Sequence, residues 1–148
     1  MEIIRTISEL RARLSSEDQV CCVPTMGNIH DGHLSLVRIG KERAPLVVTT
    51  VFVNRLQFGQ SDDFSRYPRT FEDDCAKLES LGNDIVFCPN EDEMYPEPQV
   101  FFIEPPKIAN GLEGRFRPGH FRGVCTVVTK LFNAVQPQMA VFGKKDYQ

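Results

Sequence analysis

The sequence lacks any apolar run that approaches the roughly eighteen residues needed to cross a membrane. Its start, with Glu2 and Arg5 among the first residues, also lacks the apolar core of a secretory signal peptide. Excess positive charge is missing as well, because 17 Lys and Arg stand against 20 Asp and Glu and give a net charge of -3. We therefore expect a cytoplasmic protein that has neither a membrane nor a nucleic acid as a general partner.

The sequence also has no CxxC pair, no internal repeat and no low-complexity tract. Its cysteines are odd in number and scattered, and most stand inside apolar runs: Cys21, Cys22, Cys75, Cys88 and Cys125. This distribution favours reduced, buried thiols over disulfide bonds.

The sequence does contain enough apolar material for one globular domain. With 148 residues, 41% hydrophobic and 25% charged, the chain can bury a substantial core. Apolar runs alternate with amphipathic ones, so we expect an α/β fold whose mainly parallel sheet is covered by helices. Capping-box patterns at 6–9 and 70–73 mark two helix starts. The expected strands are 20–23, 46–53, 85–88, 100–103 and 139–142, and the expected helices are 7–14, 34–43, 71–81 and 124–135.

The stretch 24–33, PTMGNIHDGH, joins an expected strand to an expected helix. A helix that follows a glycine-containing turn points its unpaired N–H groups and the positive end of its dipole above the strand, which suits a nucleotide phosphate. Gly27 and Gly32 let the backbone turn sharply or approach a ligand closely. His30 and His33, three residues apart, can then face one phosphate together.

Metal binding is an alternative for these histidines and for two acids further along the chain. His30 and His33 can be half of a metal site or plain surface residues. The nearest cysteines alternate across a strand and cannot both reach the pair, so we discount metal ligation there. Asp73 and Asp74 can hold magnesium beside nucleotide phosphates, or they can be first-turn acids that the helix dipole favours.

Further polar residues follow two of the expected strands. Asn54 and Gln57 come after the strand 46–53, at the sheet edge where ligands of open α/β proteins lie, and their amides suit a hydroxylated carboxylic acid. Lys145 follows the last strand and can reach back to phosphates. Plain solvent exposure is the alternative for Gln57, and a solvated turn is the alternative for Lys145.

Five blocks of the chain together resemble the pantothenate synthetase (pantoate:β-alanine ligase) family: PTMGNIHDGHLSLV, TVFVNRLQFGQSDDFSRYPRT, IVFCPNEDEMYP, RPGHFRGVCTVVTKLFNAVQP and VFGKKDYQ. The HDGH core is similar to the HxGH variant of the HIGH motif in the wider nucleotidyltransferase superfamily, which implies a Rossmann-like three-layer fold. Departures from the family pattern are modest. Arg55 stands where proline is common, Asn28 and Ile29 differ from a small residue and leucine, and Lys144 replaces an acid.

The resemblance implies ligation in two steps. Pantoate attacks the α-phosphorus of ATP to give pantoyl adenylate and pyrophosphate, and β-alanine then displaces AMP to give pantothenate. His33 would be the proton donor, His30 and Lys145 would contact phosphate, Gln57 would hold pantoate and later β-alanine, and Mg2+ would accompany ATP. The implied ATP-binding residues are Met26, Gly27, Asn28, Ile29, His30, Asp31, Gly32, His33, Gly143, Lys144, Lys145 and Asp146.

The family chain is considerably longer than this one. Its second pantoate-binding glutamine would follow Gln148, and a loop resembling KMSKS and a carboxyl-terminal domain would come later. The resemblance therefore implies that residues 1–148 are a truncated amino-terminal nucleotide- and pantoate-binding domain, weak or inactive alone, from a homodimer. Two alternatives stay open. Another HIGH-type nucleotidyltransferase would share His30 and His33 without the block around Gln57, and a fragment can also be a non-enzymatic nucleotide-binding module.

Overall fold

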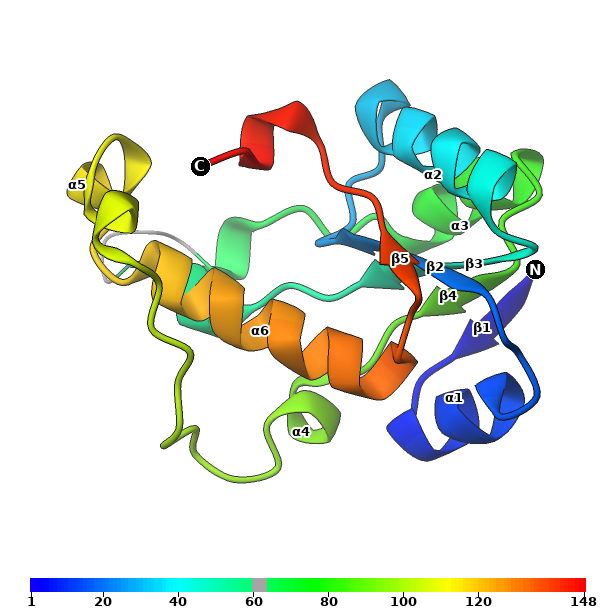
Figure 1. Cartoon of the computed structure of the whole chain (residues 1–148), viewed down its shortest axis with the longest axis horizontal. Coiled ribbons are helices and arrows are strands. Elements are labelled where there is room, and N and C mark those ends of the chain that lie inside the picture. The colour runs from blue at the N-terminus through cyan, green and yellow to red at the C-terminus, as the bar shows by residue number, and fades with distance from the viewer. Residues whose placement is uncertain (60–63) are drawn as a thin grey trace.

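A parallel sheet lies at the centre of the protein (Figure 1). The computed structural model describes residues 1–59 and 64–148, and within these residues five strands pair in the order β1-β4-β3-β2-β5. Every pairing is parallel, which confirms the predicted α/β fold. The strands are β1 Glu2–Ile4, β2 Val20–Thr25, β3 Leu46–Val51, β4 Ile85–Phe87 and β5 Met139–Ala140.

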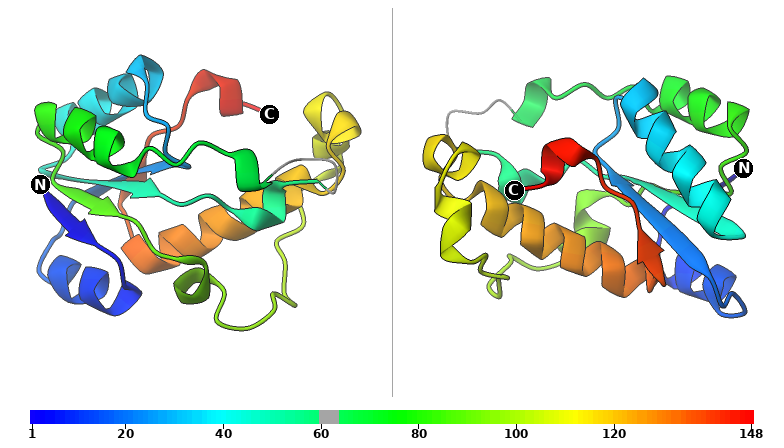
Figure 2. Two further views of the ribbon diagram at one scale, coloured as in Figure 1. Left: turned by 180° about the vertical axis from the view of Figure 1, so that it is seen from behind. Right: turned by 45° about the horizontal axis from the view of Figure 1, so that its top comes forward.

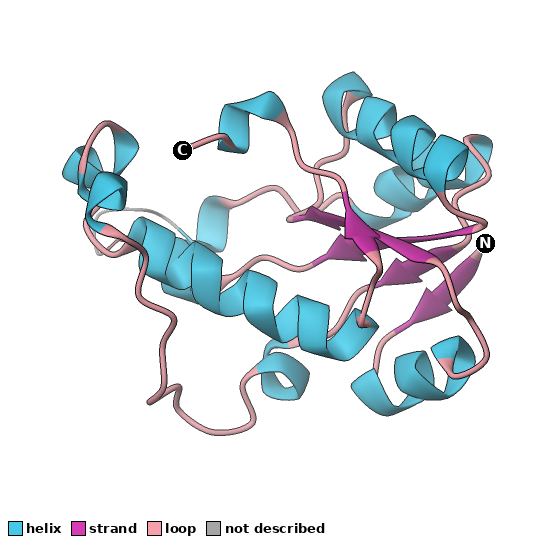
Figure 3. Cartoon of the chain, in the orientation of Figure 1, coloured by secondary structure: helices cyan, strands magenta, loops and turns pink. Residues whose placement is uncertain are grey.

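Helices cover both faces of the sheet and complete three layers (Figure 2). On one face lie α2, Asp31–Arg43, and α3, Phe71–Ser80. On the other lie α1, Ile7–Leu14, and α6, His120–Val135. Shorter helical segments lie in the connections (Figure 3): α4 Glu91–Met94, α5 Glu113–Phe116, and the 3-10 turns η1 Arg55–Gln57, η2 Phe64–Arg66, η3 Lys107–Asn110 and η4 Lys144–Asp146.

Alternating side chains of the strands build two apolar cores. Val47 and Val48 are neighbours in β3 and are both fully buried, but Val47 packs in the core under α2 and α3 while Val48 packs in the core under α1 and α6. Cys21 and Cys22 of β2 divide in the same way. Burying both faces requires strands that are apolar throughout, as expected for a parallel sheet between helices.

The two helix starts predicted from capping boxes are confirmed in position, whereas α2 and α6 begin three and four residues earlier than predicted. The capping of the two confirmed starts differs. Thr6 accepts the N–H of Glu9 at 3.2 Å, and its hydroxyl donates to the Glu9 carboxylate at 2.7 Å. The capping box predicted for α3 is wrong, because Thr70 makes no side-chain capping bond there. Its hydroxyl donates to Asp74 at 3.1 Å instead. Both threonines thus end up bonded to an acid of the first turn.

The predicted strand 100–103 is wrong. Val100 and Phe101 are 74% and 84% exposed, and the N–H of Ile103 donates to the Thr126 hydroxyl at 3.1 Å rather than to a neighbouring strand. The sheet edge is taken by β1, which the sequence analysis missed because three residues beside charged neighbours give little strand signal.

Two remaining sequence features are the acids of the second family block and the lack of a membrane-spanning run. Asp62 and Asp63, in the charged part of the second family block, lie outside the described residues. Among the residues that are described, no helix combines the length and the apolar character that crossing a membrane requires.

Candidate functional site

The turn between β2 and α2 adopts a left-handed backbone. Gly27 has φ +81° and Asn28 has φ 53°. A Cβ on Gly27 would lie 3.1 Å from an Asp74 oxygen and 3.2 Å from Val51, so this position excludes larger residues by both conformation and space. Asparagine tolerates the left-handed region better than most residues, which explains why Asn28 fits beside the glycine.

The carboxylate of Asp74 anchors this turn from below. One of its oxygens accepts the N–H of Asn28 at 2.9 Å, and the other accepts the N–H of Ile29 at 2.6 Å. Thr70 adds a third hydrogen bond, and Asp74 is only 1% exposed. Ile29 itself is 2% exposed, so its backbone, and not its side chain, belongs to the candidate site. Sequence reasoning missed this anchoring role of Asp74.

His30 and His33 form a reciprocal cap at the start of α2. His30 is the N-cap residue, and its Nδ1 accepts the N–H of Gly32 at 3.1 Å. His33 Nδ1 accepts the N–H of His30 at 3.4 Å, and the centres of the two rings lie 4.1 Å apart. Because both Nδ1 atoms accept, each neutral ring carries its proton on Nε2. The pair therefore offers two Nε2–H donors at the positive end of a helix dipole.

Gly32 makes the cap possible. A Cβ at this position would lie 2.8 Å from a carbon of the His30 ring, so a larger residue would push the imidazole away from the backbone N–H that it accepts. This close approach explains the glycine of the HDGH motif in physical terms.

The surroundings of His33 favour its neutral form. Burial lowers the pKa of His33 below 6.5, and the charges of His30 and Lys145 lower it further, while Asp146 and Asp74 act in the opposite direction. The influence of Lys145 and Asp146 shows that η4 lies close to the histidine pair. The four residues Gly143, Lys144, Lys145 and Asp146 follow β5, which pairs with β2, so both segments emerge at the same sheet edge.

Gln57 lies beside the glycine turn, as predicted. Its amide nitrogen donates to the Met26 sulfur at 3.1 Å, and its amide oxygen accepts from Asn54 at 3.1 Å. Asn54, which we predicted as a second substrate contact, is 1% exposed. Its amide also donates to the Gly123 carbonyl, and its oxygen accepts the Tyr95 hydroxyl at 2.8 Å. In this structure Asn54 therefore positions Gln57.

The first turn of α6 supports Gln57 from the other side. His120 Nδ1 lies 2.9 Å from the Gln57 carbonyl oxygen and must donate to it, since a carbonyl only accepts. A Cβ on Gly123 would overlap the carbonyl of Leu56, so the two backbones touch directly. Burial raises the pKa of Tyr95 to about 12, which keeps its hydroxyl protonated as a donor to Asn54. Sequence reasoning gave His120, Gly123 and Tyr95 no role, although the glycine-rich block RPGHFRG was an available signal for His120 and Gly123.

The predicted magnesium ligands have other partners. Asp73 is exposed and pairs with Lys77 at 2.7 Å, while both oxygens of Asp74 accept hydrogen bonds from the chain. Within the described ranges no group of three or more His, Cys, Asp or Glu side chains is placed to hold a metal ion. The geometry therefore adds no support to a magnesium role for Asp73 and Asp74, which stays a prediction.

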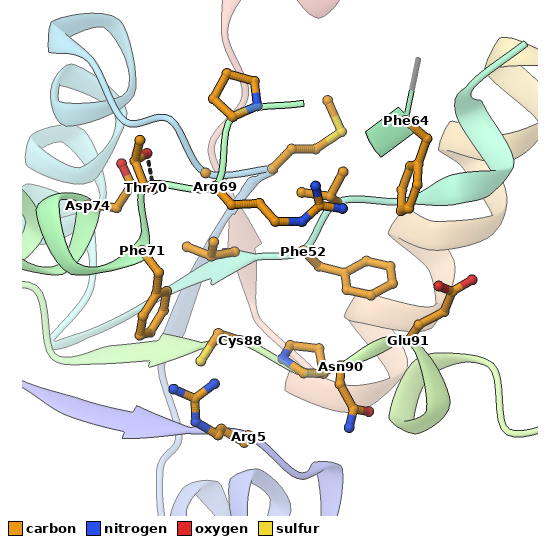
Figure 4. Close-up of a pocket in the computed structure, with 16 residues that line it drawn as sticks. Arg5, Phe52, Phe64, Arg69, Thr70, Phe71, Asp74, Cys88, Asn90 and Glu91 are labelled. Carbon is orange, nitrogen blue, oxygen red and sulfur yellow. Dashed lines mark hydrogen bonds between the residues drawn. The ribbon is translucent and has the colours of Figure 1, made fainter. Parts of the chain in front are cut away.

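A cavity of about 360 Å³ opens beside the glycine turn (Figure 4). Met26, Gly27 and Asp74 belong to its wall, but His30 and Gln57 do not. It is thus a neighbour of the histidine pair and does not enclose it.

Together these features define a Rossmann-like α/β protein of the kind that HIGH-motif nucleotidyltransferases represent: an open parallel sheet with a glycine turn and a capped helix start at its carboxyl edge. A model of the pantoate-beta-alanine ligase family matches residues 2–148. The chain belongs to this family, which confirms the resemblance in its sequence blocks.

Curated relatives agree with the family match. The chain is 62% identical over 149 residues to the pantothenate synthetase of Chromobacterium violaceum and 60% identical over 148 residues to that of Nitrosospira multiformis. Both alignments cover 100% of this chain but only 54% and 53% of the relatives. The chain therefore spans about half the length of the curated relatives it matches.

Solved structures give the same result. A pantothenate synthetase from Thermus thermophilus superimposes with a TM-score of 0.95 at 49% identity, covering 99% of this chain and 53% of that one. A pantoate-beta-alanine ligase from Francisella tularensis, solved with beta-gamma ATP and beta-alanine, gives a TM-score of 0.90 at 38% identity, covering 95% of this chain and 55% of that one. The predicted fold class is confirmed, and the roles of individual site residues stay predictions.

Proposed function

We propose that residues 1–148 are the nucleotide- and pantoate-binding part of an enzyme that joins pantoate to β-alanine at the expense of ATP, with AMP and pyrophosphate as the other products. The observation that carries the proposal is the reciprocal cap of His30 and His33, which leaves two Nε2–H donors at a helix start. Family membership and the ATP and β-alanine bound to the Francisella tularensis relative support the choice of substrates.

In the first step, the pantoate carboxylate attacks the α-phosphorus of ATP and expels pyrophosphate. Catalysis of such a transfer depends mainly on positioning and on stabilising developing charge. His30 and His33 donate from Nε2 to the phosphoryl oxygens, and Lys145 supplies a positive charge. Because its low pKa keeps His33 neutral before ATP arrives, its Nδ1 continues to accept the backbone bond that orients the ring.

In the second step, the β-alanine amine attacks the acyl carbon of pantoyl adenylate and AMP leaves. Gln57 binds pantoate through its amide and keeps the acyl carbon in place while β-alanine enters. The network of Asn54, His120 and Gly123 supports this role, since it fixes the backbone and the side chain of Gln57.

In this proposal Mg2+ binds only together with ATP. Mg2+ in nucleotide sites is commonly held by phosphate oxygens and water with one or two carboxylates. Asp73 and Asp74 do not fit as a ready pair of ligands, because one is bonded to Lys77 and the other to the glycine turn. We therefore assign them no step.

We also propose that the enzyme acts as a homodimer in the cytoplasm. The dimer is supported by five apolar side chains of the segment 100–116 that are all more than 70% exposed and would be covered at an interface: Val100, Phe101, Ile108, Leu112 and Phe116. The cytoplasm is supported by the five cysteines, all of which are free. Light scattering of the purified chain tests the dimer, and Phe101→Glu should lower the measured mass if this surface is the interface.

A hybrid enzyme tests the function. This chain is joined to the part of the Chromobacterium violaceum relative that follows the matched 149 residues, and products from ATP, pantoate and β-alanine are identified by mass spectrometry. We expect pantothenate and AMP from the hybrid, and from residues 1–148 alone a rate lower by several orders of magnitude, because cooperating groups are missing together. A hybrid that makes no pantothenate, or a chain of 148 residues within about tenfold of it (roughly 1.4 kcal/mol), contradicts the proposal.

A further inference from the structure

The cavity beside the glycine turn has apolar walls and two cationic groups. It lies beyond the ends of β1, β3 and β4, with Phe52, Phe64 and Phe71 among its walls (Figure 4). Its volume of about 360 Å³ falls within the range of small-molecule sites. The histidine pair, Gln57 and Lys145 all lie outside its wall, and of the residues expected to bind ATP only Met26 and Gly27 belong to it.

The two cations are held on separate walls. The Arg5 guanidinium lies 5.1 Å from the centre of the Phe71 ring, and the Arg69 guanidinium lies 5.3 Å from that of Phe64. Figure 4 shows Arg5 beneath Cys88 and Arg69 above Phe52. Stacking on an aromatic ring restrains a guanidinium without using up its hydrogen-bond donors.

The acids of the cavity are already engaged. Glu91 pairs with Arg55 at 2.7 Å, and Asp74 accepts bonds from the glycine turn. Within the described ranges no carboxylate pairs with Arg5 or Arg69. Arg69 uses Nη1 to bond the carbonyls of Ser65 and Tyr67, and the Arg5 guanidinium is held by its ring contact. Two guanidinium groups therefore face an apolar space and still have N–H donors available for a ligand.

We propose that this cavity binds a short aliphatic dicarboxylate, with one carboxylate on Arg5, the other on Arg69 and the methylene chain against the phenylalanine rings. Arginine matches a carboxylate with two parallel N–H donors. Polyphosphates suit the cavity less, because Asp74 and Glu91 also line it and their negative charges oppose a more highly charged ligand. The inference does not depend on the ligase activity.

The test uses glutarate as the probe and the 15N-labelled 148-residue chain, followed by two-dimensional NMR. We expect saturable shifts that gather on the amides of Arg5, Arg69, Thr70 and Phe71. Glutaramide, which has the same length without charge, and butyrate, which has one carboxylate, should each bind at least tenfold more weakly (roughly 1.4 kcal/mol). These ligand comparisons need no mutation, so they stand even if a variant fails to fold.

Variants then locate the site. Arg5→Met and Arg69→Met keep an unbranched side chain on the ring and remove the charge, and each should weaken glutarate at least tenfold. Arg38→Met removes an exposed arginine of α2 and should leave binding unchanged. The proposal is overturned if glutarate gives no saturable shifts, if glutaramide or butyrate binds equally well, if the shifts gather at His33 and Lys145, or if the folded Arg5→Met and Arg69→Met variants bind as the wild type does.

Discussion

The two sides of the candidate site are held in different ways. On the proposed nucleotide side, His30 and His33 accept backbone N–H groups two and three residues away. On the proposed pantoate side, Gln57 lies on a 3-10 turn of three residues and depends on Asn54, which bonds the Gly123 carbonyl 69 residues away. One side is a local motif, whereas the other exists only after α6 has packed against η1.

Because of this difference, mutations elsewhere in the fold should affect the two sides unequally. A reciprocal cap forms wherever its helix starts correctly, so the histidine pair should survive most changes elsewhere in the fold. The position of Gln57 depends on backbone contact across the core, so changes in α6 should damage pantoate binding and spare ATP binding. Asp74 is the exception on the local side, because it ties the glycine turn to α3.

The largest effect should come from His33. In the hybrid enzyme, His33→Ala should slow pantoyl adenylate formation at least about 100-fold, since a lost donor to transition-state charge costs about 3 kcal/mol or more. Rapid-quench measurement of adenylate gives the rate.

His33→Gln is the matched control for folding. Glutamine at this third helical position can return the capping bond to the His30 N–H, so the variant should melt close to the wild type while still losing the imidazole. If His33→Gln forms adenylate within tenfold of the wild-type rate, the ring has no part in the chemistry and the local side is only a helix cap.

Asp74→Asn should give the next largest effect, on stability. An amide offers one acceptor where the carboxylate offers two, so either Asn28 or Ile29 loses the partner of its buried N–H. We expect a loss of about 2 to 3 kcal/mol in the free energy of unfolding, measured by urea denaturation of the 148-residue chain.

The adjacent Asp73→Asn is the control for charge alone. Its pair with Lys77 is an exposed contact within one helix, and its removal should change the free energy of unfolding by less than about 0.5 kcal/mol. Equal losses in the two variants would show that Asp74 does not anchor the turn.

Gln57→Ala should produce a smaller and more selective effect. Calorimetric titration of the hybrid should show pantoate binding about tenfold weaker or more, a loss of roughly 1.4 kcal/mol, with the affinity for ATP unchanged. His120→Ala, which removes the donor to the Gln57 carbonyl, should weaken pantoate in the same direction by less. A matching loss of ATP affinity in either variant would erase the distinction between the two sides.

The smallest effect should be the pH dependence of His33. Burial lowers its pKa in the folded chain below 6.5, so as pH falls through 6.5 the unfolded chain takes up the proton first and folding stability declines. Above this pH, His33 no longer makes folding stability depend on pH. NMR titration of the His33 ring should give a midpoint below 6.5, and His33→Gln should flatten the acid side of the stability curve. A midpoint at or above 6.5 contradicts the account of its surroundings.

The sequence predicted the local side well and the distant side poorly. The strand, turn and helix around His30 and His33 could be predicted because periodicity, glycines and caps act over a few residues. The contacts of Asn54 with Tyr95 and of Gln57 with His120 could not, because they arise from packing between segments far apart in the chain. The same limit explains why β1 was missed and why 100–103 was wrongly predicted as a strand. Pairing with β4, which is distant in the sequence, makes residues 2–4 the edge strand.

Titration of ATP into the 15N-labelled 148-residue chain tests the central claim most directly, namely that the histidine cap and η4 form the nucleotide site while Gln57 serves the other substrate. We expect the largest amide shifts at Gly32, His33 and Lys145, with the amides of Gln57 and Gly123 almost unmoved. Largest shifts at Gln57 and Gly123, or no saturable shift at His33, would contradict it.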